Sequence, residues 1–155
     1  MIIPIHYNPS AEVADLQTVL SEAEKMMAFL DSKERHIFAL HHSQVTEKPL
    51  NFFVISSGES YDWISEALGS RIIINPRVTG GEGPMYMYEG CASFPHRTPK
   101  NVLRNTIVQV EFDIPGPDGK FEHKAMMVAR IIAQIFQHEC DHANGKNIYF
   151  KSPKQ

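Results

Sequence analysis

The 155-residue chain lacks any apolar run near 18 residues, so no segment is long enough to cross a membrane as a helix. Its first four residues, MIIP, lack the basic region and the long apolar stretch of a signal peptide. Neither sign of charge is in large excess, because the formal net charge is −3, the pI is about 6.2 and the basic residues are scattered. We therefore expect a cytoplasmic protein that binds neither membranes nor nucleic acid directly.

Internal repeats and low-complexity segments are also missing. With 43% apolar residues, the chain is long enough to bury the core of a single domain spanning residues 1–155. It has only two cysteines, Cys91 and Cys140. They could in principle form a disulfide, but in a reducing compartment the expected role of Cys91 is that of a thiolate metal ligand. We expect Cys140 to be a small packing residue.

The pattern of apolar residues predicts an α+β fold, with antiparallel strands between an N-terminal and a C-terminal helix. Ser10 is placed to cap the first helix, whose apolar stripe comprises Val13, Leu16, Leu20, Ala23, Met27 and Leu30. Strands are expected at residues 36–41, 51–56, 71–75, 85–88, 108–112 and 121–124. From about Met127 the apolar spacing again predicts a helix, which ends before Gly145 as a left-handed cap.

Residues 138–142, with the sequence HECDH, are the most informative part of this last helix. His138 and His142 lie four residues apart, which puts their Cβ atoms roughly 5–6 Å apart on one helix face, with Glu139 between them in the sequence. A histidine on an apolar helix face is more often a hydrogen-bonded core residue than a ligand. Two histidines that flank a glutamate favour a metal that activates water.

A catalytic metal site of this kind needs a third protein ligand. The metzincin pattern would place it at Ile148, which cannot bind a metal, and thirteen residues after His142 leave no room for the further helix of a thermolysin-like protease. We therefore expect the ligand to come from upstream. The candidates are His6, His36, His41, His42, His96, His123 and Cys91.

The setting of Cys91 makes the chain recognisable. Residues 89–93, EGCAS, resemble the EGCLS motif of peptide deformylases, and HECDH resembles their HExDH motif, including the aspartate. The stretch IFQHECDHANGK resembles the family's QHExDHLxGK, and RIIINP at residues 71–76 resembles its strand ending in INP. The resemblance implies a deformylase-like α+β fold, with antiparallel sheets packed around the C-terminal helix. It also implies that Cys91, His138 and His142 hold one divalent metal, Fe(II) physiologically, with Zn(II) or Ni(II) as substitutes.

The resemblance also implies roles for other residues. Glu139 would be the general base and then the general acid, while the side-chain amide of Gln44 and the backbone N–H of Ala92 would stabilise the oxyanion. Arg97 falls where the family has an arginine and is a candidate for substrate contact. We expect Asp141 to orient a ligand or to pair with an arginine, Arg104 being the candidate.

One segment departs from the family. Its pattern GxGLAAxQ corresponds to IFALHHSQ at residues 37–44, in which both glycines and both alanines are replaced. Leu40, His41 and His42 are expected to bind substrate, with one histidine pointing into a narrowed cleft and the other into the core.

The leading function is therefore a hydrolase of protein biosynthesis that removes the N-formyl group from N-formylmethionyl peptides and releases formate. Its partners would be an N-formylated peptide or small N-formyl compound and, transiently, the ribosome. The altered cleft motif leaves two alternatives. One is a metallohydrolase acting on a different N-formyl or N-acyl substrate, and the other is a non-catalytic metal-binding homologue.

Overall fold

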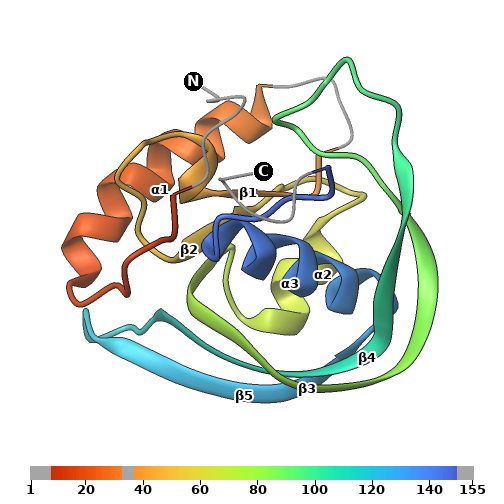
Figure 1. The fold of residues 1–155 in the computed structure, drawn as a ribbon. Helices are drawn as coiled ribbons and strands as arrows, with labels where there is room; N and C mark the ends of the chain where they lie inside the picture. The colour runs from red at the N-terminus through yellow and green to blue at the C-terminus, as the bar shows by residue number, and fades with distance from the viewer. Residues whose placement is uncertain (1–7, 33–36, 150–155) are drawn as a thin grey trace.

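The computed structural model describes residues 8–32 and 37–149 (Figure 1). Along the chain, the elements are α1 (Leu16–Asp31), β1 (Ala39–His41), the 3₁₀ turn η1 (His42–Gln44), β2 (Phe52–Ile55), α2 (Asp62–Leu68), β3 (Ile72–Glu89), β4 (Lys100–Pro115), β5 (Phe121–Ala129) and α3 (Arg130–Ala143). This is the predicted α+β arrangement.

The five strands form one antiparallel sheet in the order β1-β2-β3-β4-β5. Strands β3 and β4 pair from Ile74 and Asp113 to Glu89 and Lys100, with register shifts near the start of this pairing. Figure 1 shows that these long strands curve around α3. As a result, the end of β3 reaches the same helix against which its beginning packs.

Strands β1 and β2 and the first three residues of β3 are covered on both faces. The side chains of Leu40, Phe52 and Val54 pack in a cluster with α1, whereas those of Phe53 and Ile55 pack in a second cluster with α3. Successive side chains of a strand point to opposite faces, so a strand covered on both faces needs a continuous apolar run. The four residues of β2 meet this need, and each is fully buried.

The predicted N-terminal helix begins later than expected. Asp15 caps α1 by accepting a hydrogen bond from the N–H of Gln17, while the Ser10 hydroxyl donates to the carbonyl of Ala143. The buried stripe of α1 is also rotated relative to the prediction. It comprises Leu16, Val19, Ala23, Met26 and Leu30.

The strands expected at residues 71–75 and 85–88 are parts of the single strand β3. The glycine-rich stretch between them stays extended because it pairs with β4. The short helix α2 was not predicted, and the predicted strand 36–41 begins outside the described residues.

The last helix also starts later than predicted, at Arg130. Met127 belongs to β5 and is 66% exposed, while Ile132, Ile135 and Phe136 of α3 enter the core. Gly145, with φ +78°, lies just beyond the helix end in the left-handed conformation, as predicted.

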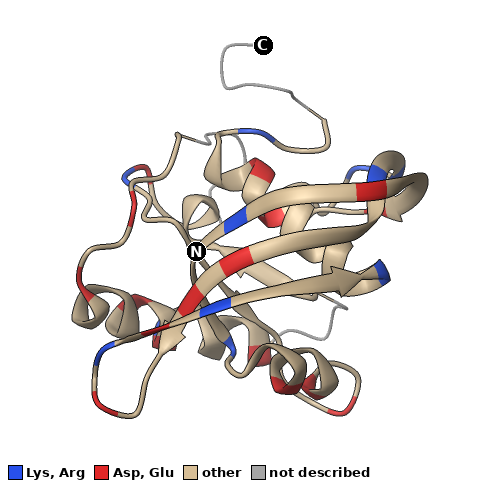
Figure 2. Ribbon diagram, turned by 90° about the horizontal axis from the view of Figure 1, so that it is seen from below, with Lys and Arg blue, Asp and Glu red and all other residues tan. Residues whose placement is uncertain are grey.

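Charged residues of both signs are distributed along β3, β4 and β5 (Figure 2). Examples are the ion pairs between Arg77 and Glu111, at 3.5 Å, and between Lys124 and Glu122, at 3.0 Å. In the part of the chain that the structure describes, no helix combines the length and the apolar character needed to span a membrane.

Candidate metal centre

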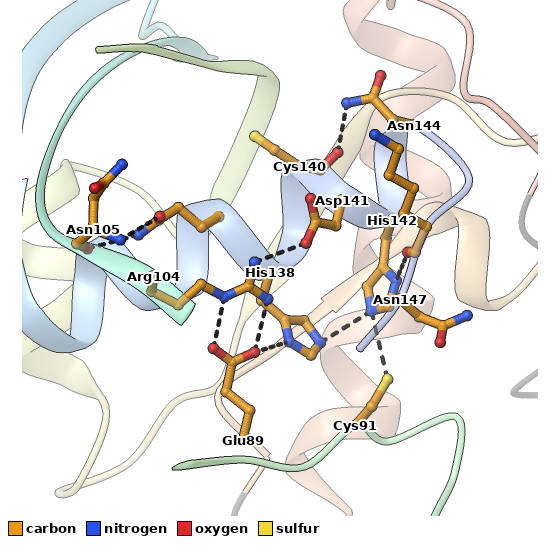
Figure 3. Close-up of polar contacts among 12 residues, drawn as sticks. Glu89, Cys91, Arg104, Asn105, His138, Cys140, Asp141, His142, Asn144 and Asn147 are labelled. Atoms are coloured by element: carbon orange, nitrogen blue, oxygen red, sulfur yellow. Dashed lines mark hydrogen bonds and ion pairs between the residues drawn. The ribbon is translucent and has the colours of Figure 1, made fainter. Parts of the chain in front are cut away.

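Helix α3 brings two imidazole rings together at the centre of the molecule (Figure 3). The Nε2 atoms of His138 and His142 lie 3.1 Å apart, and the Sγ atom of Cys91 lies 3.5 Å from Nε2 of His142. All three possible ligand atoms lie within 4.8 Å of one another. Among the described residues, this is the one group of histidine, cysteine and acidic side chains close enough to hold a metal ion.

The other nitrogen of each ring determines where its lone pair points. His138 Nδ1 lies 2.8 Å from Oε1 of Glu89, and His142 Nδ1 lies 3.0 Å from the carbonyl oxygen of Lys146. A carboxylate or carbonyl oxygen only accepts, so each Nδ1 carries a proton and, in the neutral ring, Nε2 is the nitrogen that presents a lone pair. Hydrogen bonds of this kind fix the rings of metal-binding histidines.

The donor set fits a small divalent metal. Metal–nitrogen bonds of about 2.0–2.1 Å and metal–sulfur bonds of about 2.3 Å place the donors of a tetrahedral site about 3.3–3.6 Å apart. The observed separations of 3.1 Å and 3.5 Å are close to these values. Two ring nitrogens this close need a proton or a metal ion between them. One thiolate and two imidazoles favour a transition metal over Mg or Ca.

The end of α3 helps to orient His142. The N–H of Lys146 donates to the carbonyl of Asp141 at 2.8 Å, and the N–H of Gly145 donates to that of His142 at 3.0 Å. This is a Schellman motif, which requires the left-handed conformation of Gly145. The turn places the Lys146 carbonyl within hydrogen-bond distance of Nδ1 of His142.

A buried ion-pair network supports His138 from the other side (Figure 3). Glu89 accepts two hydrogen bonds of 2.8 Å from Arg104, whose Nη1 also lies 2.7 Å from Oδ2 of Asp141. Burial by itself would raise the pKa of Glu89, but the hydrogen bonds from Arg104 and His138 outweigh it and lower the pKa to about 2. Glu89 is therefore a carboxylate that fixes the His138 ring.

The predicted pairing of Asp141 with Arg104 is present, whereas the part played by Glu89 was missed. The sequence did contain a signal for this role. Glu89 lies two positions before the ligand Cys91, at the end of a strand, and an ionisable residue there is well placed to contact a second ligand such as His138.

Glu139 lies next to the donors, and its Oε2 is buried without a hydrogen-bond partner among the described residues. Burial raises the pKa of this carboxyl group to about 7, because the charged form loses its solvation. A carboxyl group with a near-neutral pKa in a cavity is typical of an acid–base catalyst.

Glu139 and His138 face a cavity of about 600 Å³. Four of the other residues predicted to form the site also line it, namely Gln44, Cys91, Ala92 and Arg97. The remainder of the wall is largely apolar and includes Phe29, Ile37, Phe38, Ala39, Ile131 and Ile135.

The side chains of Leu40, His41 and His42 do not line this cavity, and their contact with substrate stays a prediction. Leu40 is fully buried against α1, and His42 stacks on Phe52 with a centroid distance of 4.7 Å. His41 is also fully buried, where it hydrogen-bonds to Asn51. Because strand β1 is covered on both faces, each side chain meets a packed layer.

The other histidines named as possible third ligands lie elsewhere or outside the described residues. His96 is exposed in the loop after Cys91, and His123 lies between Asp113 and Glu111 on the sheet surface. His6 and His36 lie outside the described residues. Cys140, whose pKa burial raises to about 12, donates to the Pro76 carbonyl, as suits a packing residue.

Comparison with known proteins identifies this arrangement. The model of the polypeptide deformylase family matches residues 4–155, nearly the whole chain. The chain belongs to this family. Its members bind a divalent metal, and the Cys91, His138 and His142 group of this deformylase-family chain is able to hold one.

Individual deformylases agree with this assignment. The Chlorobaculum tepidum peptide deformylase is 34% identical over 74 residues, or 48% of this chain and 37% of that protein. The Halothermothrix orenii enzyme is 36% identical over 80 residues, or 52% of this chain and 49% of that protein. The aligned stretches thus span less than half the length of these curated relatives.

Solved structures share the fold over more of the chain. The Plasmodium falciparum peptide deformylase has a TM-score of 0.71 at 26% identity, covering 95% of this chain and 83% of its own. A probable peptide deformylase from Synechococcus phage S-SSM7 has a TM-score of 0.73 at 22% identity, covering 96% of this chain and 98% of its own.

Proposed function

We propose that this chain is a metal-dependent hydrolase that removes the N-formyl group from N-formylmethionyl peptides and releases formate. The observation that carries the proposal is the convergence of three possible metal-ligand atoms beside the buried Glu139 carboxyl group, whose Oε2 lacks a hydrogen-bond partner among the described residues. Membership of the deformylase family supports the same reaction. Such an enzyme would act in the cytoplasm on nascent chains and would contact the ribosome transiently.

In this proposal, Cys91, His138 and His142 hold one divalent ion. When bound, the ion supplies a Lewis acid that makes water a nucleophile near neutral pH. We propose Fe(II) as the physiological metal, with Zn(II) or Ni(II) able to replace it. The soft Cys91 thiolate is compatible with these metals.

Glu139 transfers the proton. Its carboxylate accepts a proton from the attacking water as the carbon–oxygen bond forms, and then donates it to the leaving amine as the carbon–nitrogen bond breaks. Its pKa of about 7 suits both steps, since the group is a usable base and a usable acid at neutral pH. The products are formate and a peptide with a free amino terminus.

Gln44 and Ala92 stabilise the oxyanion that develops on the formyl oxygen. The Nε2 atom of Gln44 lies 2.9 Å from Ser93 Oγ and 3.9 Å from Cys91 Sγ, which keeps this donor beside the cleft. The second donor is the backbone N–H of Ala92, a residue that also lines the cavity. Donors fixed in advance in this way lower the barrier because they need no reorganisation.

The cavity wall favours an apolar side chain next to the formyl group. Ile131 and Ile135 line it, and Arg97 lies at its rim for contact with a peptide carbonyl. Ile37 and Ala39 also line it, at positions where the family pattern has glycine. These larger residues favour a narrower cleft. A narrower cleft is the observation that supports the alternative function, in which the substrate is a different small N-formyl or N-acyl compound.

A formate-release assay on a formyl-Met-Ala-Ser peptide tests the proposal, with metal content measured on the same samples. Glu139→Gln is expected to keep the metal and to lower kcat by about 10²–10⁴-fold, because it removes the general base. Glu111→Gln, on the outer sheet, is the control and should retain activity. A metal-loaded protein that releases no formate would contradict the proposal, and activity on another acyl amide alone would select the alternative substrate.

A further inference from the structure

His41 is a fully buried histidine at the start of the turn that carries Gln44. Its Nδ1 lies 3.0 Å from the backbone N of Ser43. A backbone N–H only donates, so Nδ1 is the acceptor and Nε2 carries the ring proton. Nε2 in turn lies 3.2 Å from Oδ1 of Asn51, to which it donates. The ring therefore joins the turn to Asn51, the residue just before strand β2.

The backbone of His41 fixes the side chain of Gln44. Its N–H donates to Oε1 of Gln44 at 2.9 Å, which completes a reciprocal capping box around η1. An amide held by its oxygen has only its NH₂ group left to present. That group points to Ser93 Oγ and Cys91 Sγ, so the capping box determines which end of the amide faces the metal centre.

The far end of this connection is firmly held. The Asn51 backbone donates to the Ala11 carbonyl at 2.7 Å and accepts from the N–H of Asn75 at 2.8 Å. Burial lowers the pKa of His41 to about 3, so its ring stays neutral and Nδ1 remains an acceptor at working pH. His42, by contrast, accepts from the Leu50 N–H and stacks on Phe52.

We propose that His41 is a positioning residue that holds the η1 turn so that Gln44 presents its amide N–H to the reacting carbonyl. This inference rests on the deformylase function proposed above. The family pattern has alanine at the position of His41, and alanine has no side-chain acceptor with which to cap the turn. The histidine is therefore a feature of this chain rather than of the family pattern.

Kinetics of His41→Ala and His41→Asn test the proposal. His41→Ala is expected to lower kcat about 10–100-fold with KM within about twofold, since a misplaced donor affects the transition state most. His41→Asn is expected to recover most of this loss, because asparagine also caps a turn through its side-chain oxygen. In a Gln44→Leu background, His41→Ala should change kcat less than about twofold, because the donor is already gone. An equal loss of kcat in both backgrounds would overturn the proposal.

Two further variants separate positioning from stability. Leu68→Ala, a buried substitution in α2 away from the η1 turn, should lower stability and leave kcat within about twofold. Asn51→Ala keeps the ring but removes the acceptor of Nε2, and should lower kcat by about 3–10-fold. Asn51→Ala therefore tests the proposal if His41→Ala does not fold, and an unchanged kcat in a folded Asn51→Ala would contradict it.

A measurement without substrate distinguishes this inference from the proposed function. In protein labelled with ¹⁵N at glutamine side chains, the Gln44 amide resonances should shift and broaden in His41→Ala and return in His41→Asn. If the wild type releases no formate but these resonances respond, the proposed function fails and the positioning role stands. Gln44 resonances that are identical in folded wild type and His41→Ala would refute the positioning role.

Discussion

Glu89 connects the candidate metal ligand His138 to the buried ion pair with Arg104. It accepts hydrogen bonds from both Arg104 and His138, and it is only 5% exposed. Removing one member of a buried ionic group leaves the others without a partner, which costs more than the group contributes as a whole. Glu89 therefore connects the stability of the fold to the affinity for metal.

Glu89→Gln keeps the size of the side chain but removes its charge. The free energy of unfolding is expected to fall by about 3–5 kcal/mol, because buried Arg104 keeps only the part-exposed Asp141 as a charged partner. Metal affinity is expected to fall about 10–100-fold, because the acceptor that orients the His138 ring loses its negative charge. Urea denaturation and competition with a chromophoric chelator measure the two effects.

Glu111→Gln is the matched control, because Glu111 pairs with Arg77 at 3.5 Å and with His123 at 3.2 Å, and these two side chains are 64% and 56% exposed. Loss of an exposed pair is expected to cost less than about 1 kcal/mol and to leave metal affinity unchanged. Equal effects of the two substitutions would contradict a special role for Glu89.

The turn after α3 has two roles, because it ends the helix and also orients a metal ligand. The turn that satisfies its last carbonyl groups also supplies the Lys146 carbonyl that orients His142. The conformation of this turn depends on Gly145, whose φ is +78°. A side chain at this position would strain the backbone and shift the acceptor of the His142 ring.

Gly145→Ala is therefore expected to lower the free energy of unfolding by about 1–2 kcal/mol and to weaken metal binding. Gly119→Ala is the control, since Gly119 has φ +77° and no atom within 4 Å of an added Cβ. It should cost a similar amount of stability with metal affinity unchanged. Chelator competition alongside urea denaturation checks both, and unchanged metal affinity in Gly145→Ala would refute the link between the turn and His142.

For the molecule as a whole, burial of His41 predicts how stability depends on pH. The ordinary pKa of 6.5 applies in the unfolded chain, whereas the native pKa is about 3. Between these values the unfolded state binds a proton that the native state does not. Stability is therefore fully present above pH 6.5 and falls, by up to about 1.4 kcal/mol per pH unit, as the pH decreases towards 3.

Comparison with His41→Asn isolates this contribution, because asparagine does not titrate. Between pH 6.5 and pH 5, the stability of metal-free wild type should fall by about 2 kcal/mol relative to the variant. Glu139 contributes in the opposite direction, since its raised pKa of about 7 favours the native state at low pH, but it is present in both proteins and cancels. Parallel pH profiles from urea denaturation would contradict the prediction.

The sequence by itself determined the features that depend on near neighbours in the chain. Spacing of four residues was enough to place His138 and His142 on one helix face, and a glycine was enough to predict the left-handed residue that ends the helix. The motifs around Cys91 and His138 were also enough to indicate the family. In each case the deciding geometry lies within one or two helical turns or one short motif.

The tertiary structure alone decided which distant residues meet. Cys91 and His142 are 51 positions apart, and β3 has to curve around α3 before they come into contact. The directions of Leu40, His41 and His42 could not be read from alternation, because β1 is covered on both faces and the turn after it changes the periodicity. Glu89 likewise became a support for His138 only when the end of β3 reached α3, since a buried charge depends on the partners that folding brings to it.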